Sequence, residues 1–265
     1  MDPISQYIEK SKQIVETVQK QKEEIQKAAR WFSDTILKGR MVHVFGSGHS
    51  RIMVEEMWPR YGSFPGFNPI VELSLSFHNL VVGANGQRQA MFLENVSGLA
   101  ARILRNFDLS VHDSAIVISS SGTSVVSVEM AELFQKQGIK VVALTTKSSA
   151  AVSASKREDG KKLHDFADLV LDTGAPKGDA MVKIPNLETP VAPGSTVGGA
   201  LLVNCIKAEV AQHLTDAGQP PKVLTGGSVV GEECSRELFE SAYDEHAHRL
   251  AKLYENVGSK QSHQT

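Results

Sequence analysis

The feature of this sequence that most restricts its fold is a pair of loops rich in small residues, each placed directly after a short apolar run. The first run covers residues 41–45 and continues into Gly-Ser-Gly-His-Ser at 46–50. The second covers residues 114–119 and continues into Ser-Ser-Gly-Thr-Ser at 120–124. A helical pattern follows each loop. Two strand–loop–helix units of this kind predict an α/β fold.

Further segments extend this alternation. Apolar runs at 140–145 and 169–172 predict two more strands, and residues 71–76 fit a fifth, while the Gly- and Pro-rich residues 62–69 are expected to form a loop. Helices are expected over residues 51–61, 94–107, 125–137 and 196–215. The pattern predicts a three-layer αβα sandwich around a central parallel sheet of about five strands. Right-handed crossovers then bring the carboxyl ends of the strands to one edge, where such folds bind ligands.

The remaining segments flank this unit. Residues 4–38 carry apolar side chains at helical spacing and predict one long amphipathic helix, or two. We therefore divide the chain into an N-terminal helical segment (1–39), a main domain (40–215), a C-terminal helical extension (216–257) and a disordered tail (258–265).

The composition argues against several classes of protein. The 28 basic and 30 acidic side chains nearly balance, so no global positive field would attract nucleic acid or an anionic membrane. No apolar run approaches the roughly 18 residues of a membrane span, and the polar stretch after Met1 does not resemble a secretion signal. Neither Cys205 nor Cys234 lies in a CxxC pair. We expect a cytoplasmic protein without a metal, a cofactor, or a nucleic-acid or membrane partner.

Both loops have the chemistry of an anion site. Small residues let a ligand approach the backbone, and the start of the following helix offers unpaired N–H groups and a positive dipole end. The candidate phosphate ligands are the polar residues of the two loops: Ser47, His49, Ser50, Ser119, Ser120, Ser121, Thr123 and Ser124. Either loop alone would also serve as a helix cap, but two at matching positions favour one shared phosphate site. Residues 194–196 form a third small-residue helix start that would close the site.

Two better-known phosphate motifs do not fit. The first loop lacks the third glycine of the dinucleotide fingerprint G-x-G-x-x-G, and it lacks the GK[ST] sequence of a nucleotide-binding P-loop. Neither motif would account for the hydroxyl-rich second loop.

These segments together resemble the SIS (sugar isomerase) domain. Residues 116–124 are similar to the family's strand and S-x-S-G-x-[ST] loop, residues 141–146 to its next strand, and residues 46–50 to its first loop. The likeness covers roughly residues 35–215. It extends to stand-alone phosphoheptose isomerase-like SIS proteins and to N-acetylmuramic acid 6-phosphate etherases.

The resemblance implies a sugar phosphate as the ligand and pairing of chains into a homodimer or homotetramer. Within the family's pattern the phosphate ligands would be Ser50, Ser119, Ser121 and Ser124. No cofactor is implied.

The resemblance transfers the catalytic residues less directly. Abstraction of a proton beside a sugar carbonyl needs a base. Glu94 resembles, in position, a glutamate that the etherases use, and His78 is the second candidate. Glu55 and Glu56 are alternatives for a further carboxylate of the etherases. Residues 193–199 contain no histidine where phosphoheptose isomerases have one, which counts against that particular activity.

Two functions therefore remain open. The first is a sugar-phosphate isomerase, or a related lyase or etherase, that acts by proton abstraction next to the carbonyl. The second is a non-catalytic phosphosugar sensor, a role that SIS domains fill in regulators. No helix-turn-helix pattern precedes the first strand, which disfavours a sensor that binds DNA directly.

Overall fold

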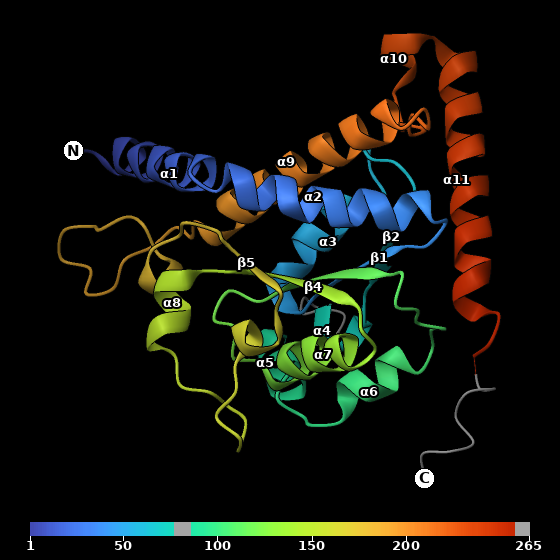
Figure 1. Cartoon of the computed structure of the whole chain (residues 1–265). Helices are drawn as coiled ribbons and strands as arrows, with labels where there is room; N and C mark the ends of the chain where they lie inside the picture. The colour runs from blue at the N-terminus through green and yellow to red at the C-terminus, as the bar shows by residue number, and fades with distance from the viewer. Residues whose placement is uncertain (77–85, 258–265) are drawn as a thin grey trace.

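One parallel sheet forms the centre of the computed structural model, which describes residues 1–76 and 86–257 (Figure 1). The five strands lie in the order β2-β1-β3-β4-β5. Their bounds are β1 (Val42–Gly46), β2 (Phe67–Ile70), β3 (Ser114–Ile118), β4 (Lys140–Thr145) and β5 (Leu169–Asp172). The predicted α/β sandwich with a parallel sheet is confirmed.

Helices cover both faces of the sheet (Figure 1). One layer contains α1 (Pro3–Gln19), α2 (Lys22–Leu37), α3 (Arg51–Met57) and α9 (Ser195–Asp216). The other contains α4 (Leu73–Ser76), α5 (Gln87–Leu93), α6 (Leu99–Leu104) and α7 (Val125–Lys136). The remaining elements are α8 (Lys147–Val152), α10 (Gly227–Val230), α11 (Glu232–Tyr254) and the short 3-10 turns η1 (Gly48–Ser50), η3 (Leu163–Phe166) and η4 (Lys177–Asp179).

The two faces of the sheet have separate apolar cores, because successive side chains of a strand point to opposite faces. From β1, Val42 and Val44 pack with Phe32 of α2 and with apolar side chains of α3 and α9. Phe45 belongs to the opposite core, which includes Phe134 of α7. In the described part of the chain, no helix combines the length and the apolar character that crossing a bilayer would require.

Several predicted boundaries were wrong. The strand expected at 71–76 lies earlier, at Phe67–Ile70, and Leu73–Ser76 is helical. Pro69 had argued for a loop, but β2 is an edge strand, where a missing N–H is tolerated. The helix expected to reach residue 61 ends at Met57, because a residue before a proline disfavours helical geometry and Trp58 precedes Pro59 in an extended conformation.

The helix expected over residues 94–107 is also interrupted. Glu94 is the C-terminal cap of α5, and a turn separates it from α6. Gly98 lies in this turn with φ of 84°, and its N–H donates to the Glu129 carboxylate (2.9 Å to Oε2). A left-handed residue held in this way ends helical geometry locally.

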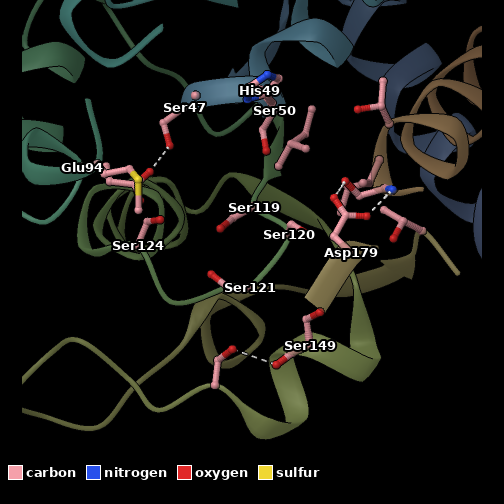
Figure 2. A pocket seen from close by; sticks show the side chains of 18 of the residues that line it. Ser47, His49, Ser50, Glu94, Ser119, Ser120, Ser121, Ser124, Ser149 and Asp179 are labelled. Atoms are coloured by element: carbon pink, nitrogen blue, oxygen red, sulfur yellow. Dashed lines mark hydrogen bonds between the residues drawn. The ribbon is translucent and has the colours of Figure 1, made fainter. Parts of the chain in front are cut away.

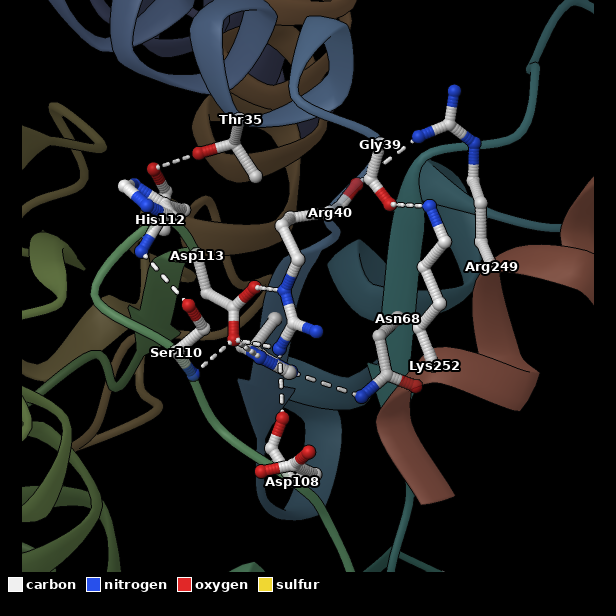
Figure 3. A network of polar contacts seen from close by, with 12 residues as sticks. Thr35, Gly39, Arg40, Asn68, Asp108, Ser110, His112, Asp113, Arg249 and Lys252 are labelled. Carbon is white, nitrogen blue, oxygen red and sulfur yellow. Dashed lines mark hydrogen bonds and ion pairs between the residues drawn. The ribbon is translucent and has the colours of Figure 1, made fainter. Parts of the chain in front are cut away.

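A buried polar network joins β1, β2 and β3 at their amino ends (Figure 3). The Asp113 carboxylate accepts hydrogen bonds from Arg40 Nε (2.7 Å) and from the Ser110 N–H (2.8 Å). His43 Nε2 lies 3.2 Å from Asp113 Oδ2, and Asn68 Nδ2 lies 3.0 Å from His43 Nδ1. The side chains of His43 and Asp113 are fully buried. Because each polar group has a partner, the network compensates for the cost of burying a charge.

The long C-terminal helix α11 is attached beside this network (Figure 3). Arg249 Nη1 donates to the carbonyl oxygens of Ile36 and Arg40, both at 3.1 Å. Lys252 Nζ donates to the Gly39 carbonyl at 3.4 Å. These bonds attach α11 to the last turn of α2 and to the segment between α2 and β1.

We predict that the Asp113 carboxylate makes folding stability depend on pH. Burial by itself would raise the pKa of Asp113, but hydrogen bonds from His43 and Arg40 outweigh it, so this pKa lies below the ordinary value of 3.8. Asp113 therefore adds stability above about pH 4, and this contribution is lost as the pH falls through the lower, folded-state pKa. Asp113→Asn should lower the free energy of unfolding at pH 7 by about 3 kcal/mol.

Urea unfolding at pH 7 and at about pH 3 measures this effect. The difference in free energy of unfolding between the wild type and Asp113→Asn should be smaller at the lower pH. Asp244→Asn, at an exposed position, is the control and should unfold with the same free energy as the wild type. A difference of equal size at both pH values would contradict the assignment.

Candidate functional site

A cavity of about 510 Å³ opens at the carboxyl ends of β1, β3 and β4 (Figure 2). Its walls come from the first loop, the end of α5, the second loop, α8, η4 and the start of α9. This is the edge of the sheet at which the sequence predicted a ligand site.

The first loop folds back tightly after β1. A Cβ on Gly46 would lie 2.7 Å from the backbone oxygen of Ser50, so only glycine fits there. The N–H of Ser50 donates to the Ser47 carbonyl (3.0 Å) and closes the turn. The Ser50 hydroxyl lines the cavity and has no hydrogen-bond partner among the described residues.

The backbone of the second loop is held by the neighbouring strand. The N–H of Thr146 donates to the Ser120 carbonyl (3.0 Å), and the N–H of Gly122 donates to the Ser119 carbonyl (3.2 Å). Gly122 has φ of 66°, a left-handed conformation that favours glycine. The loop is therefore shaped before a ligand arrives.

The hydroxyls of the second loop fall into two groups. Ser120 Oγ lies 3.1 Å from Thr146 Oγ1, and Ser121 Oγ lies 3.0 Å from Thr123 Oγ1, so these side chains help to hold the loop. The hydroxyls of Ser119 and Ser124 have no hydrogen-bond partner in the described part of the chain, and both residues line the cavity. They are available to a ligand.

Glu94 is held between the two loops. Its Oε2 accepts a hydrogen bond from Ser47 Oγ at 2.8 Å (Figure 2). Its backbone carbonyl accepts from the N–H of Val126, in the first turn of α7, at 2.9 Å. A carboxylate thus lies in the same cavity as the unpaired hydroxyls.

The opposite wall contains charged residues that the sequence did not single out. Asp179 has φ of 56°, which is uncommon for a residue other than glycine. Its Oδ1 accepts from the N–H groups of Gly194 (3.0 Å) and Ser195 (2.6 Å), and its Oδ2 accepts from Ser195 Oγ (2.5 Å). Lys177, two residues earlier, is exposed and lines the same cavity. The small residues at 194–196 were expected to close the site, but nothing in the sequence pairs them with residue 179.

The structure brings most of the predicted site residues together. The cavity is lined by Ser47, His49, Ser50, Glu94, Ser119, Ser120, Ser121 and Ser124. Thr123 is buried behind the second loop and does not line the cavity. His78 lies outside the described residues.

The alternative carboxylates lie elsewhere on α3. Glu55 forms an ion pair with Arg51 (3.0 Å), Glu56 pairs with Arg60 and Asn204, and neither glutamate lines the cavity. Over residues 1–76 and 86–257, no three His, Cys, Asp or Glu side chains gather as a metal site would require.

Comparison with known proteins identifies the family. The SIS domain profile matches residues 6–146, more than half of the chain. The chain belongs to the SIS domain family. This SIS protein is 30% identical over 249 residues to the UPF0309 protein BH0227 of Halalkalibacterium halodurans, covering 94% of this chain and 97% of the relative. It is also 30% identical over 243 residues to the UPF0309 protein GK1441 of Geobacillus kaustophilus, covering 91% and 94%.

The fold of this SIS protein also resembles that of a phosphoheptose isomerase from Francisella tularensis. The TM-score is 0.51 at 19% identity, and the match covers 79% of this chain and 96% of the other. At this level of identity the likeness concerns the fold alone.

We predict that Asp179 anchors the start of α9 in this SIS protein. Asp179→Ala removes acceptors of three hydrogen bonds and places alanine at a positive φ, so the free energy of unfolding should fall by about 2 kcal/mol. Asp179→Asn is the matched control, because asparagine keeps one acceptor and tolerates the left-handed region. Urea unfolding would contradict this role if Asp179→Ala and the wild type shared one midpoint.

Proposed function

We propose that this SIS protein binds a sugar phosphate and acts as an isomerase, or as a related lyase, by abstracting a proton next to the sugar carbonyl. One observation carries the proposal. The carboxylate of Glu94 shares a single cavity with unpaired hydroxyls from both loops. A cavity of about 510 Å³ has the size typical of small-molecule sites.

The phosphate is assigned to the start of α7. This helix has 12 residues, and its N-terminus, the positive end of its dipole, follows directly after the second loop. A phosphate dianion accepts hydrogen bonds and donates none, so it needs free donors. The hydroxyls of Ser50, Ser119 and Ser124 meet this need because each is unpaired and lines the cavity.

Glu94 is assigned as the base. Its backbone bond to Val126 keeps it beside the first turn of α7, and therefore close to a phosphate bound there. In an isomerisation the carboxylate takes the proton from the carbon next to the carbonyl. The released electron pair forms the C=C bond of an enediolate while the carbonyl oxygen becomes negative. The hydroxyl on the deprotonated carbon passes its proton to that oxygen and becomes the new carbonyl, while return of the first proton to the former carbonyl carbon completes the exchange. Loss of a β-substituent from the enediolate instead gives elimination.

The wider organisation forms part of the proposal. We assign residues 40–215 to the SIS core and residues 1–39 and 216–257 to helical additions. We further propose a homodimer or homotetramer in the cytoplasm, with α1 at the contact. Ile4, Ile8 and Val15 are 73%, 51% and 47% exposed, and their spacing places them on one side of that helix.

Thermal shift with a panel of ligands tests the binding proposal. The panel contains fructose 6-phosphate, glucosamine 6-phosphate, sedoheptulose 7-phosphate, N-acetylmuramic acid 6-phosphate, the matching free sugars and inorganic phosphate. A phosphorylated ligand should raise the melting temperature of the wild type, because it binds only the folded state. Ser119→Ala should bind it about tenfold more weakly, and Ser228→Ala, outside the cavity, should not. No stabilisation by any phosphorylated member would contradict the proposal.

Turnover of the stabilising ligand tests the role of Glu94. Glu94→Gln keeps the size of the side chain but cannot accept the proton, so the rate should fall by a factor of about 100 or more. The mutant should still bind inorganic phosphate. Unchanged turnover would remove Glu94 from the mechanism, and binding by the wild type without turnover would favour the phosphosugar sensor instead.

A further inference from the structure

Ser47 differs from Ser50, Ser119 and Ser124 in that its hydroxyl proton is already donated to a carboxylate. Its side chain is buried, with 8% of the residue exposed, and its Oγ donates to Glu94 Oε2 at 2.8 Å. The hydroxyl of Ser50, in the same loop and three residues later, has no hydrogen-bond partner in the described ranges. The Ser47 hydroxyl therefore already donates to a protein group, whereas the Ser50 hydroxyl is free to donate to a ligand.

The count of donors separates their roles. A serine hydroxyl has one proton and two acceptor lone pairs. A phosphate dianion and a carboxylate both act only as acceptors, so Ser47 cannot donate to both at once. Turning its proton to a phosphate would leave a half-buried carboxylate without its side-chain donor, next to a second anion. The geometry favours Glu94 as the lasting partner of Ser47.

Glu94 is also anchored from the other side. Its backbone carbonyl is bound by the N–H of Val126, which follows the second loop, while its carboxylate is bound by Ser47, which belongs to the first loop. The first loop and the first turn of α7, which follows the second loop, thus hold the base at both ends. Any shift of either loop would move the carboxylate relative to the ligand.

We propose that Ser47 is a positioning residue that holds the Glu94 carboxylate in its working orientation and does not bind the phosphate. This inference rests on the proposed function of the site, because Glu94 is assigned there as the base. It divides the first loop between two tasks. Ser50 donates to the phosphate, and Ser47 fixes the rotamer of Glu94. The carboxylate then keeps the same orientation when the sugar binds.

Ser47→Ala and Ser50→Ala form a matched pair that separates these tasks. Calorimetric titration with inorganic phosphate measures binding without any need for turnover. Ser50→Ala should raise the Kd for inorganic phosphate about tenfold, and Ser47→Ala should leave it unchanged. For the panel member that is turned over, Ser47→Ala should lower kcat about tenfold with little change in KM. Ser47→Thr, which keeps the hydroxyl, should recover most of this loss. A rise in Kd for Ser47→Ala equal to that for Ser50→Ala would overturn the inference.

A second measurement separates this inference from the proposed function. Melting temperatures of Ser47→Ala, Glu94→Ala and the double mutant form a cycle that needs neither a ligand nor catalysis. The double mutant should melt above the value expected from summing the two single shifts, because both mutations disrupt the same hydrogen bond. Additive shifts in melting temperature would show that the side chains of Ser47 and Glu94 do not interact, and would reject this inference even if the protein binds sugar phosphates. A non-additive cycle in a protein that binds no phosphate would retain the contact and reject the proposed function.

Discussion

The parallel pairing of β1 with β3 is the constraint on which the site depends. The register places Gly46 opposite Ile118, so both strands end at the same level of the sheet. The two small-residue loops begin there and lie side by side. On the other side of β3, the Ser119 N–H donates to the Leu144 carbonyl (3.0 Å), which extends the pairing with β4 into the second loop. A change of register would separate the hydroxyls of one loop from the carboxylate held by the other.

The opposite end of the same strands carries the buried charges that hold the sheet together. Asp113 with Arg40 and His43 joins the amino ends of β1 and β3, and Asn68 adds β2. None of these four side chains lines the cavity at the carboxyl ends. Polar groups that stabilise the fold and polar groups that are open to a ligand are therefore kept at separate edges. Leaving the cavity hydroxyls without a protein partner costs little free energy because water can reach them. A fully buried carboxylate cannot be hydrated, so it needs hydrogen-bond partners within the protein.

The strands show which structural features local sequence patterns can predict and which they cannot. β4 and β5 were predicted with the observed bounds, because each is an uninterrupted apolar run next to a polar boundary. β2 was missed because Pro69 argues against a strand, and only its position at the edge of the sheet makes the proline acceptable. Residues 150–165 are mostly polar and charged, a composition typical of a solvent-exposed loop. Leu163 in this segment is nevertheless buried, and its N–H donates to the Gly122 carbonyl (2.9 Å). Edge position and long-range packing are properties of the assembled sheet and leave no local pattern.

The sequence by itself determined the order of strands and helices, the parallel sheet and the two hydroxyl-rich loops, because apolar periodicity and small residues after a strand act over a few neighbouring positions. Tertiary structure decided how those residues are used. Only the fold shows that the Ser47 proton is donated to Glu94, that Thr123 lies behind the loop, and that Asp179 of η4 lines the cavity and accepts hydrogen bonds from the start of α9. The physical reason is that a hydroxyl or carboxylate takes its role from its nearest partner, and that partner is here 47 residues away for Ser47 and 16 for Asp179.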